Sequence, residues 1–126
     1  MKIYNKLHQV SINLKHTTNT SSPHFTFLIK RNNIICFGVN NTVKTHPLAN
    51  QFGHRFNSIH SELACINNFQ YPISQLNKFD MVNVRITSDN KLAMSKPCNQ
   101  CIRMLRSFGV HEVVYSTKHG FKRFQL

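Results

Sequence analysis

Two short patterns, far apart in the sequence, constrain the fold of this chain more than any other feature. One is Pro97–Cys101, with the sequence P-C-N-Q-C, and the other is His60–Glu62, with the sequence H-S-E. Cysteines three residues apart lie on one face of a helix, and cysteine and histidine are side chains that zinc prefers. We therefore expect a fold that brings the starts of two helices together around one metal ion.

The candidate ligands His60, Cys98 and Cys101 suit a catalytic metal better than a structural one. A helix start lowers thiol pKa values and so favours the thiolates that bind zinc, and His60 adds a neutral nitrogen. Three protein ligands leave the fourth tetrahedral position to water, whereas a structural zinc site has four. A structural site, or a coincidental histidine and thiols, is the alternative. His54 and Cys65 are the nearest spare ligands.

Glu62 is the candidate group for proton transfer. It follows His60 by two residues at the start of a predicted helix, so it can face a metal-bound water without binding the metal itself. The alternative is an ordinary acidic residue in a first helical turn. The other two cysteines, Cys36 in a predicted strand and Cys65 on the apolar side of a predicted helix, are expected in the core.

Length, composition and charge limit the class of protein. The chain of 126 residues fits one domain, residues 1–126, and its 10 Phe and 3 Tyr can supply a core. With 16 Lys and Arg against 4 Asp and Glu, the net charge of +12 favours polyanions or phosphorylated small molecules as partners. No apolar run reaches the roughly 18 to 20 residues of a membrane span. The C-x-x-C pattern indicates the cytoplasm, where thiols stay reduced.

Hydrophobic periodicity predicts alternating helices and strands in a layered α/β domain with a mixed sheet. Predicted helices cover 2–15, 59–70 with Ser58 as N-cap and Pro72 as the end, and a third that begins at Pro97 and ends at Gly109. Predicted strands cover 25–29, 34–39, 81–86, 91–95 and 110–116, the last of them closing the fold. Residues 40–57 lack periodicity and are expected to form a long loop.

H-x-E followed by P-C-x-x-C is typical of zinc deaminases, and the chain resembles the cytidine deaminase-like superfamily from Phe25 to Ser116. The first ligand, a histidine, and the segment 97–115 are most similar to deoxycytidylate deaminases. The resemblance implies a three-layer α/β/α fold with a mixed sheet of about five strands, a zinc cofactor and a homo-oligomer. It also implies contacts to the sugar, the 5′-phosphate and the base, made respectively by Asn40, by Lys44 with His46, and by Tyr115.

By this resemblance the activity is hydrolytic deamination of dCMP to dUMP with release of ammonia. Three alternatives stay open: deamination of a base in tRNA or single-stranded DNA, deamination of free cytidine or deoxycytidine, and a zinc-stabilised binding module without activity. The net charge suits a polynucleotide substrate. The basic cluster near the C-terminus is either a solvated surface or a phosphate or nucleic-acid contact, and it contains Lys118, His119, Lys122 and Arg123.

Overall fold

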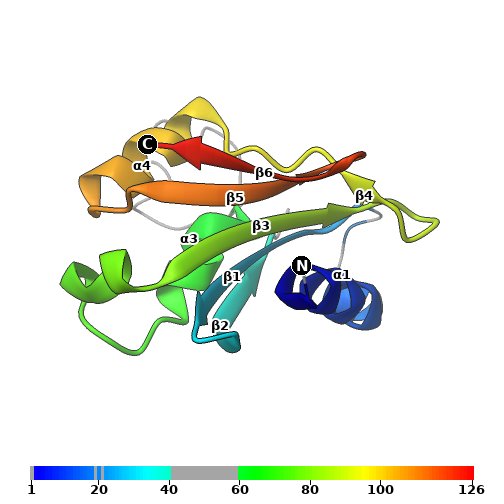
Figure 1. Cartoon of the computed structure of the whole chain (residues 1–126), viewed down its shortest axis with the longest axis horizontal. Coiled ribbons are helices and arrows are strands. Elements are labelled where there is room, and N and C mark those ends of the chain that lie inside the picture. The colour runs from blue at the N-terminus through cyan, green and yellow to red at the C-terminus, as the bar shows by residue number, and fades with distance from the viewer. Residues whose placement is uncertain (1, 19, 21, 41–59) are drawn as a thin grey trace.

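The computed structural model describes residues 2–18, 20, 22–40 and 60–126 of the chain (Figure 1). The helices are α1 (Lys2–Leu14), the 3₁₀ helix η1 (Lys15–Thr17), α3 (Ser61–Asn67), the 3₁₀ helix η2 (Ile73–Lys78) and α4 (Asn99–Ser107). The strands are β1 (His24–Lys30), β2 (Asn33–Val39), β3 (Asp80–Ile86), β4 (Leu92–Ala93), β5 (Glu112–Thr117) and β6 (Gly120–Gln125). None of the described helices has the length and apolar character needed to cross a membrane.

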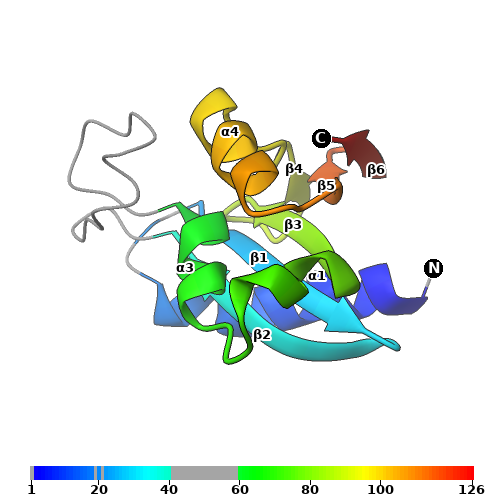
Figure 2. The same ribbon diagram turned by 90° about the vertical axis from the view of Figure 1, so that its left-hand side faces the viewer.

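A six-stranded mixed sheet forms the middle layer. The strand order is β2-β1-β3-β5-β6, and β4 pairs with β3 beside this path. β3 and β5 run parallel, and the other neighbouring strands run antiparallel. Figures 1 and 2 show α1 on one face of the sheet and α3 and α4 on the other. The predicted three-layer α/β/α fold is therefore confirmed.

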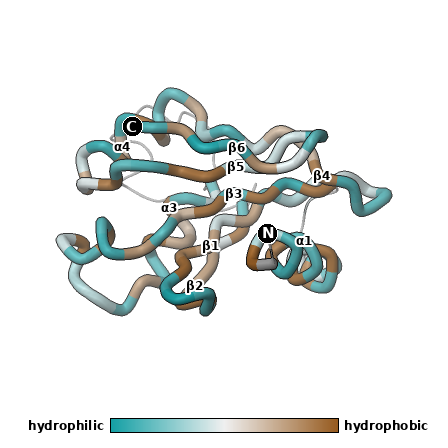
Figure 3. The backbone as a smooth tube through the Cα atoms, viewed as in Figure 1, coloured by the Kyte–Doolittle hydropathy of each residue, from teal (hydrophilic) through white to brown (hydrophobic). Residues whose placement is uncertain are grey.

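Two hydrophobic clusters hold the layers together, one on each face of the sheet. The cluster under α1 includes Leu7, Phe25, Phe27, Val82 and Val84, and the cluster under α3 and α4 includes Leu28, Leu63, Met81, Leu105 and Val113. Figure 3 shows hydrophobic residues recurring along the central strands. Because successive side chains of a strand point to opposite faces, Thr26 and Asn83 point away from α1, toward α3 and α4.

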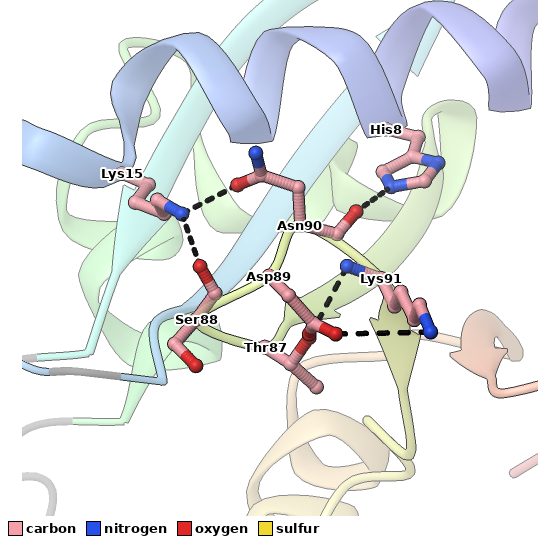
Figure 4. Close-up of polar contacts among 7 residues, drawn as sticks. All are labelled: His8, Lys15, Thr87, Ser88, Asp89, Asn90 and Lys91. Carbon is pink, nitrogen blue, oxygen red and sulfur yellow. Dashed lines mark hydrogen bonds and ion pairs between the residues drawn. The ribbon is translucent and has the colours of Figure 1, made fainter.

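Two hairpins join β1 to β2 and β3 to β4, and the second also anchors α1. Arg31 and Asn32 have φ values of 53° and 63° in the β1–β2 turn. In the β3–β4 turn, the carbonyl of Asn90 accepts a hydrogen bond from Nε2 of His8 at 2.9 Å, and Lys15 donates to the carbonyl of Ser88 at 2.8 Å (Figure 4). These bonds, from His8 of α1 and Lys15 of η1, fix the helix across the end of β3.

The prediction for the second helix was wrong at both ends. The N-cap of α3 is His60, two residues after Ser58, which itself lies outside the described residues. The helix ends at Asn67, well before Pro72, because the side chain of Asn68 donates a hydrogen bond to the carbonyl of Phe37 on β2 at 2.8 Å. Pro72 instead precedes η2, a 3₁₀ helix that the sequence analysis did not predict.

The prediction that residues 110–116 form the last strand was also wrong. β5 spans Glu112–Thr117, and β6 returns antiparallel to it over Gly120–Gln125. Gly120 adopts a φ of 126°, and the Oγ1 of Thr117 donates to its carbonyl at 3.2 Å, which closes the turn. β6 contains two basic residues between its two phenylalanines, Phe121 and Phe124. Apolar and polar residues therefore do not alternate strictly, and the sequence lacks the usual pattern of a strand.

Candidate metal centre and active-site pocket

Cys98 and Cys101 lie at the start of α4. Cys98 is the N-cap residue, and its Sγ accepts a hydrogen bond from the backbone N–H of Cys101 at 3.5 Å. The helix begins at Asn99, so the prediction that it begins at Pro97, with this proline in its first turn, was wrong. The reason is that the Cys98 thiol takes the capping role, which requires extended backbone at that residue. This cap keeps both sulfur atoms at the N-terminal end of α4.

His60 lies at the start of α3 as its N-cap, with φ −78° and ψ 156°. This helix packs directly on β2 at Gly38. A Cβ atom on Gly38 would lie 2.1 Å from the backbone nitrogen of Cys65 and 2.5 Å from the carbonyl carbon of Ala64. Only glycine permits such a close approach, so Gly38 sets how near α3 lies to the sheet and thereby where His60 is held.

The three candidate ligands meet between the starts of the two helices. Nδ1 of His60 lies 3.6 Å from Sγ of Cys98 and 3.4 Å from Sγ of Cys101, and the three ligand atoms lie within 4.8 Å of one another. Zinc bonds of about 2.1 Å to nitrogen and about 2.3 Å to sulfur place tetrahedral ligand atoms roughly 3.6 Å apart. The spacing of the cluster therefore fits a zinc ion with one coordination position left over.

The spare cysteine does not join this cluster. Cys65 is fully buried, and its Sγ lies 3.9 Å from that of Cys36, which packs against the same hydrophobic cluster between α3 and the sheet. The prediction that Cys65 is a core residue is confirmed, whereas Cys36 is only partly buried against that core. His54, the other spare candidate, lies outside the described residues.

The pKa values of the two thiols in the cluster are shifted in opposite directions. A hydrogen bond from the Cys101 thiol, and a weaker contribution from His60, lower the pKa of Cys98 to about 3 in spite of burial. The same contact with Cys98, together with burial, raises the pKa of Cys101. Contact with Cys98 also raises the pKa of His60, against the effect of burial. Zinc binds thiolate and neutral imidazole, so metal binding must release protons here.

Glu62 lies beside the cluster in the first turn of α3 and is only 5% exposed. Its Oε1 accepts a hydrogen bond from Oγ of Ser61 at 3.3 Å, and its Oε2 accepts one from Nδ2 of Asn83 at 3.1 Å. Burial raises the pKa of this carboxyl group, although the bond from Asn83 opposes the rise. A carboxyl group with a raised pKa can both take up and release a proton near neutral pH.

Three polar residues that were not identified from the sequence hold Glu62 in place, Asn83 by direct contact and Thr26 and Ser95 through their bonds to Asn83. Oγ1 of Thr26 lies 2.7 Å from Oδ1 of Asn83 and 2.8 Å from Oγ of Ser61. Nδ2 of Asn83 also donates to the carbonyl of Ser95 at 3.1 Å. The available signal was a polar residue flanked on both sides by apolar residues in each of two strands, Thr26 in β1 and Asn83 in β3, because such a residue needs a buried partner.

A cavity of about 160 Å³ opens onto this arrangement. Its lining residues come from the start of β1, the end of β2, the starts of α3 and α4, and the β4–α4 loop. They are His24, Asn40, His60, Ser61, Glu62, Ser95, Lys96 and Cys98. Burial, with a smaller effect of Arg85, lowers the pKa of His24 to about 4, so this imidazole is neutral at pH 7. A larger cavity of about 450 Å³, lined among others by Tyr4 and Phe79, contains none of the candidate site residues.

The predicted substrate contacts divide into three groups. Asn40 lines the cavity, where its Oδ1 accepts a hydrogen bond from the backbone N–H of His24 at 3.0 Å. Lys44 and His46 lie outside the described residues. Tyr115 is the register partner of Asn83 on the neighbouring strand, but it is not among the described residues that line the cavity.

Comparison with known proteins gives one family and one shared fold. Residues 1–117 match the family described as the cytidine and deoxycytidylate deaminase zinc-binding region. The structure is similar to a crystal structure of cytidine deaminase from Mycobacterium leprae, with a TM-score of 0.58 and 13% sequence identity. That similarity covers 95% of this chain and 92% of the other. No curated protein matches the sequence.

The family match spans nearly the whole chain and includes the segments that contain His60, Cys98 and Cys101. The donor set of one imidazole and two thiols is chemically suited to zinc, and its spacing agrees with zinc geometry. Zinc is accordingly the cofactor of this site, and the chain belongs to the family of cytidine and deoxycytidylate deaminases that bind zinc.

Proposed function

We propose that the protein hydrolyses the exocyclic C–N bond of the cytosine base of dCMP, giving dUMP and ammonia. The observation that carries this proposal is the position of Glu62. Its carboxyl group lines the same cavity as His60 and Cys98, next to the candidate metal cluster. A buried acid beside an open metal position is the arrangement that hydrolytic deamination needs.

The roles of the cluster follow from its donor atoms. We assign His60, Cys98 and Cys101 as the zinc ligands. When bound, zinc supplies the activation of the attacking water. The chain's own contribution is to hold three donors at tetrahedral spacing, with α3 and α4 each beginning at the site.

Glu62 carries the protons in this proposal. Addition of water to C4 of the base requires removal of a proton from the water and delivery of a proton to ring N3. Departure of the amine then requires transfer of the second water proton to the amino nitrogen, after which the C–N bond breaks and ammonia leaves. One carboxyl oxygen of Glu62 can serve each transfer in turn, while Asn83 holds Oε2 in place.

A mononucleotide is the substrate class that we propose. The net charge of +12 attracts phosphorylated molecules, and Asn40 at the cavity is our candidate for the sugar contact. Lys44 and His46 remain candidates for the phosphate, and Tyr115 for the base, on the resemblance to deoxycytidylate deaminases. We place the reaction in the cytoplasm, where the zinc-binding thiols stay reduced.

A panel of substrates tests the proposal. Zinc-loaded protein is mixed separately with dCMP, CMP, deoxycytidine and tRNA, beside a Glu62→Ala control, and the deaminated product is detected by mass spectrometry. Turnover of dCMP that is abolished in the control supports the proposal. Product from tRNA alone would move the activity to polynucleotides, and the tRNA affinity should then fall steeply with salt. Absence of product throughout would favour a binding module.

The proposal includes self-association into a homo-oligomer. Two large apolar side chains of β2, Ile35 and Phe37, are 39% and 38% exposed, and an interface between copies would remove them from water. Light scattering after size-exclusion chromatography measures the mass of the assembly, and a mass of one chain at micromolar concentration would contradict this part of the proposal.

A further inference from the structure

Lys96 holds a position at the cavity that the sequence analysis did not identify. It lies in the loop between β4 and α4, two residues before Cys98, and it lines the same cavity as Glu62 and Asn40. Lys96 is an exposed lining residue of the cavity that also contains the candidate proton carrier, and its Nζ lies over Phe124 on β6.

The backbone beside Lys96 is held firmly, although its side chain reaches into solvent. The backbone N–H of Ser95 donates to the carbonyl of Ser116 at 2.9 Å, and the carbonyl of Ser95 accepts from Nδ2 of Asn83 at 3.1 Å. That same Nδ2 donates to Glu62. The side chain of Asn83 therefore holds both Glu62 and the loop that contains Lys96. The backbone of Lys96 is thus fixed in position relative to Glu62.

The charge of Lys96 is not neutralised by an acid. Its Nζ lies 4.3 Å from the ring centroid of Phe124 on β6, and no ion pair to Lys96 occurs in the part of the chain that the structure describes. A contact with an exposed ring is weaker than a charge-assisted hydrogen bond to phosphate. Lysine is a flexible point charge that binds phosphate readily, so Nζ can leave the ring for an anionic ligand.

Lys96 is the one lysine or arginine among the described residues that line the cavity, and it is exposed. His24 is held neutral at pH 7, and Arg85, beside it on β3, donates from Nε to Oγ of Ser22 at 2.9 Å. Glu62 is the one carboxylate among the described lining residues, and it lies on the buried side. A base that enters toward Glu62 carries any phosphate at its opposite, outer end, where the Lys96 side chain can meet it by turning away from Phe124.

We infer that Lys96 binds the 5′-phosphate of the substrate and makes the enzyme prefer a nucleotide over its nucleoside. This inference rests on the proposed function. The phosphate monoester carries roughly −1.5 to −2 charges at pH 7, whereas deoxycytidine carries none, so only the nucleotide gains from the lysine. Lys96 is thus a specificity-determining residue for this site.

The test compares Lys96→Met, which keeps the aliphatic stem, with Lys96→Arg, which keeps the charge, and with Lys78→Met, which removes an exposed lysine of η2 that is outside the cavity lining. Each zinc-loaded protein is assayed for kcat and KM with dCMP and with deoxycytidine. Calorimetry measures binding of the products dUMP and deoxyuridine, which does not depend on turnover.

For Lys96→Met we expect the KM for dCMP and the Kd for dUMP to rise about tenfold or more, the loss that a charge-assisted hydrogen bond supports. The kcat for dCMP and all values for the nucleosides should stay within about twofold. Lys96→Arg should retain most of the preference, and Lys78→Met all of it. Equal losses for nucleotide and nucleoside, or no loss for either, would overturn the inference.

The two proposals fail in different ways. If the wild type deaminates dCMP and Lys96→Met keeps the full preference for dUMP over deoxyuridine, the proposed function stands and the inference is wrong. If no substrate is turned over but Lys96 still sets the preference for dUMP, the proposed function is wrong and the inference stands. If dUMP binds no more tightly than deoxyuridine to the wild type, the inference is wrong whatever the activity.

Discussion

The side-chain nitrogen of Asn83 lies 3.1 Å from Oε2 of Glu62, and both groups are almost fully buried. This bond joins the middle of β3 to the first turn of α3. An amide that donates to a carboxylate stabilises its charged form, so Asn83 moderates the pKa that burial raises. We regard Asn83 as a positioning residue, since it acts on the substrate through Glu62.

Replacing Asn83 by alanine should slow the reaction and move its pH profile. We expect kcat to fall about 10-fold or more, because Glu62 loses the donor that orients it. The pKa of Glu62 should rise further, so the acidic limb of the kcat/KM profile should shift to higher pH. The measurement is a pH–rate series beside Asn67→Ala, an exposed asparagine at the end of α3. An unchanged acidic limb would contradict this role.

Removing one sulfur ligand should remove the metal while removing a core thiol should not. For Cys98→Ser we expect zinc affinity to fall by more than about 100-fold, a larger loss than outer partners of a zinc site produce. Cys36→Ser is the matched control, because that thiol lies on β2, away from the metal cluster. Atomic absorption on purified protein measures zinc per chain, and full zinc occupancy in Cys98→Ser would refute the assigned ligand set.

Replacing Gly38 by alanine should destabilise the fold by about 3 kcal/mol or more, since the added Cβ meets backbone that cannot move aside easily. Gly120→Ala separates this contact from backbone strain. Gly120 has a φ of 126° but no atom within 4 Å of an added Cβ, so only the strain applies, at about 1 to 3 kcal/mol. Urea unfolding measures both variants. A smaller loss for Gly38→Ala than for Gly120→Ala would be inconsistent with the close contact of α3 and β2.

His24 should make the stability depend on pH. Its pKa falls from 6.5 to about 4 on folding, so between these values the unfolded chain binds more protons than the folded one. The contribution of His24 is therefore fully present above pH 6.5 and is lost as the pH falls toward 4, up to a few kcal/mol.

His24→Gln should flatten this part of the curve. Chemical unfolding of the variant and of the wild type between pH 7 and pH 4.5 gives the comparison, and loss of zinc at low pH affects both proteins alike. His119→Gln, an exposed histidine in the β5–β6 turn, serves as the control. Parallel curves for wild type and His24→Gln would show that His24 does not protonate as described.

The sequence was most informative where chemistry is local. The spacing of Cys98 and Cys101, with a proline before them, indicated a helix start, and His60 and Glu62 are two residues apart. Apolar periodicity located α1, the first hairpin and β3 to within one or two residues.

The support of the site could not be predicted, because it depends on strand pairing between distant segments. Thr26 and Asn83 are 57 residues apart, yet they are direct cross-strand partners of β1 and β3. A register shift of one residue in either strand would turn the polar side chain of that strand to the α1 face. Lys96 gave no signal either, because a single exposed lysine is ordinary until the cavity beside it is known.

The most direct test of the account is Glu62→Gln at matched zinc content. Gln keeps the shape of the side chain but cannot transfer protons, so we expect full zinc occupancy and no detectable dUMP from dCMP. In the metal-free protein burial raises the pKa of Glu62, so the charged form is disfavoured in the fold as the pH rises above 4.5, and Gln should increase the free energy of unfolding of the metal-free protein at pH 7. Product formation by zinc-loaded Glu62→Gln at a rate near that of the wild type would contradict the central claim.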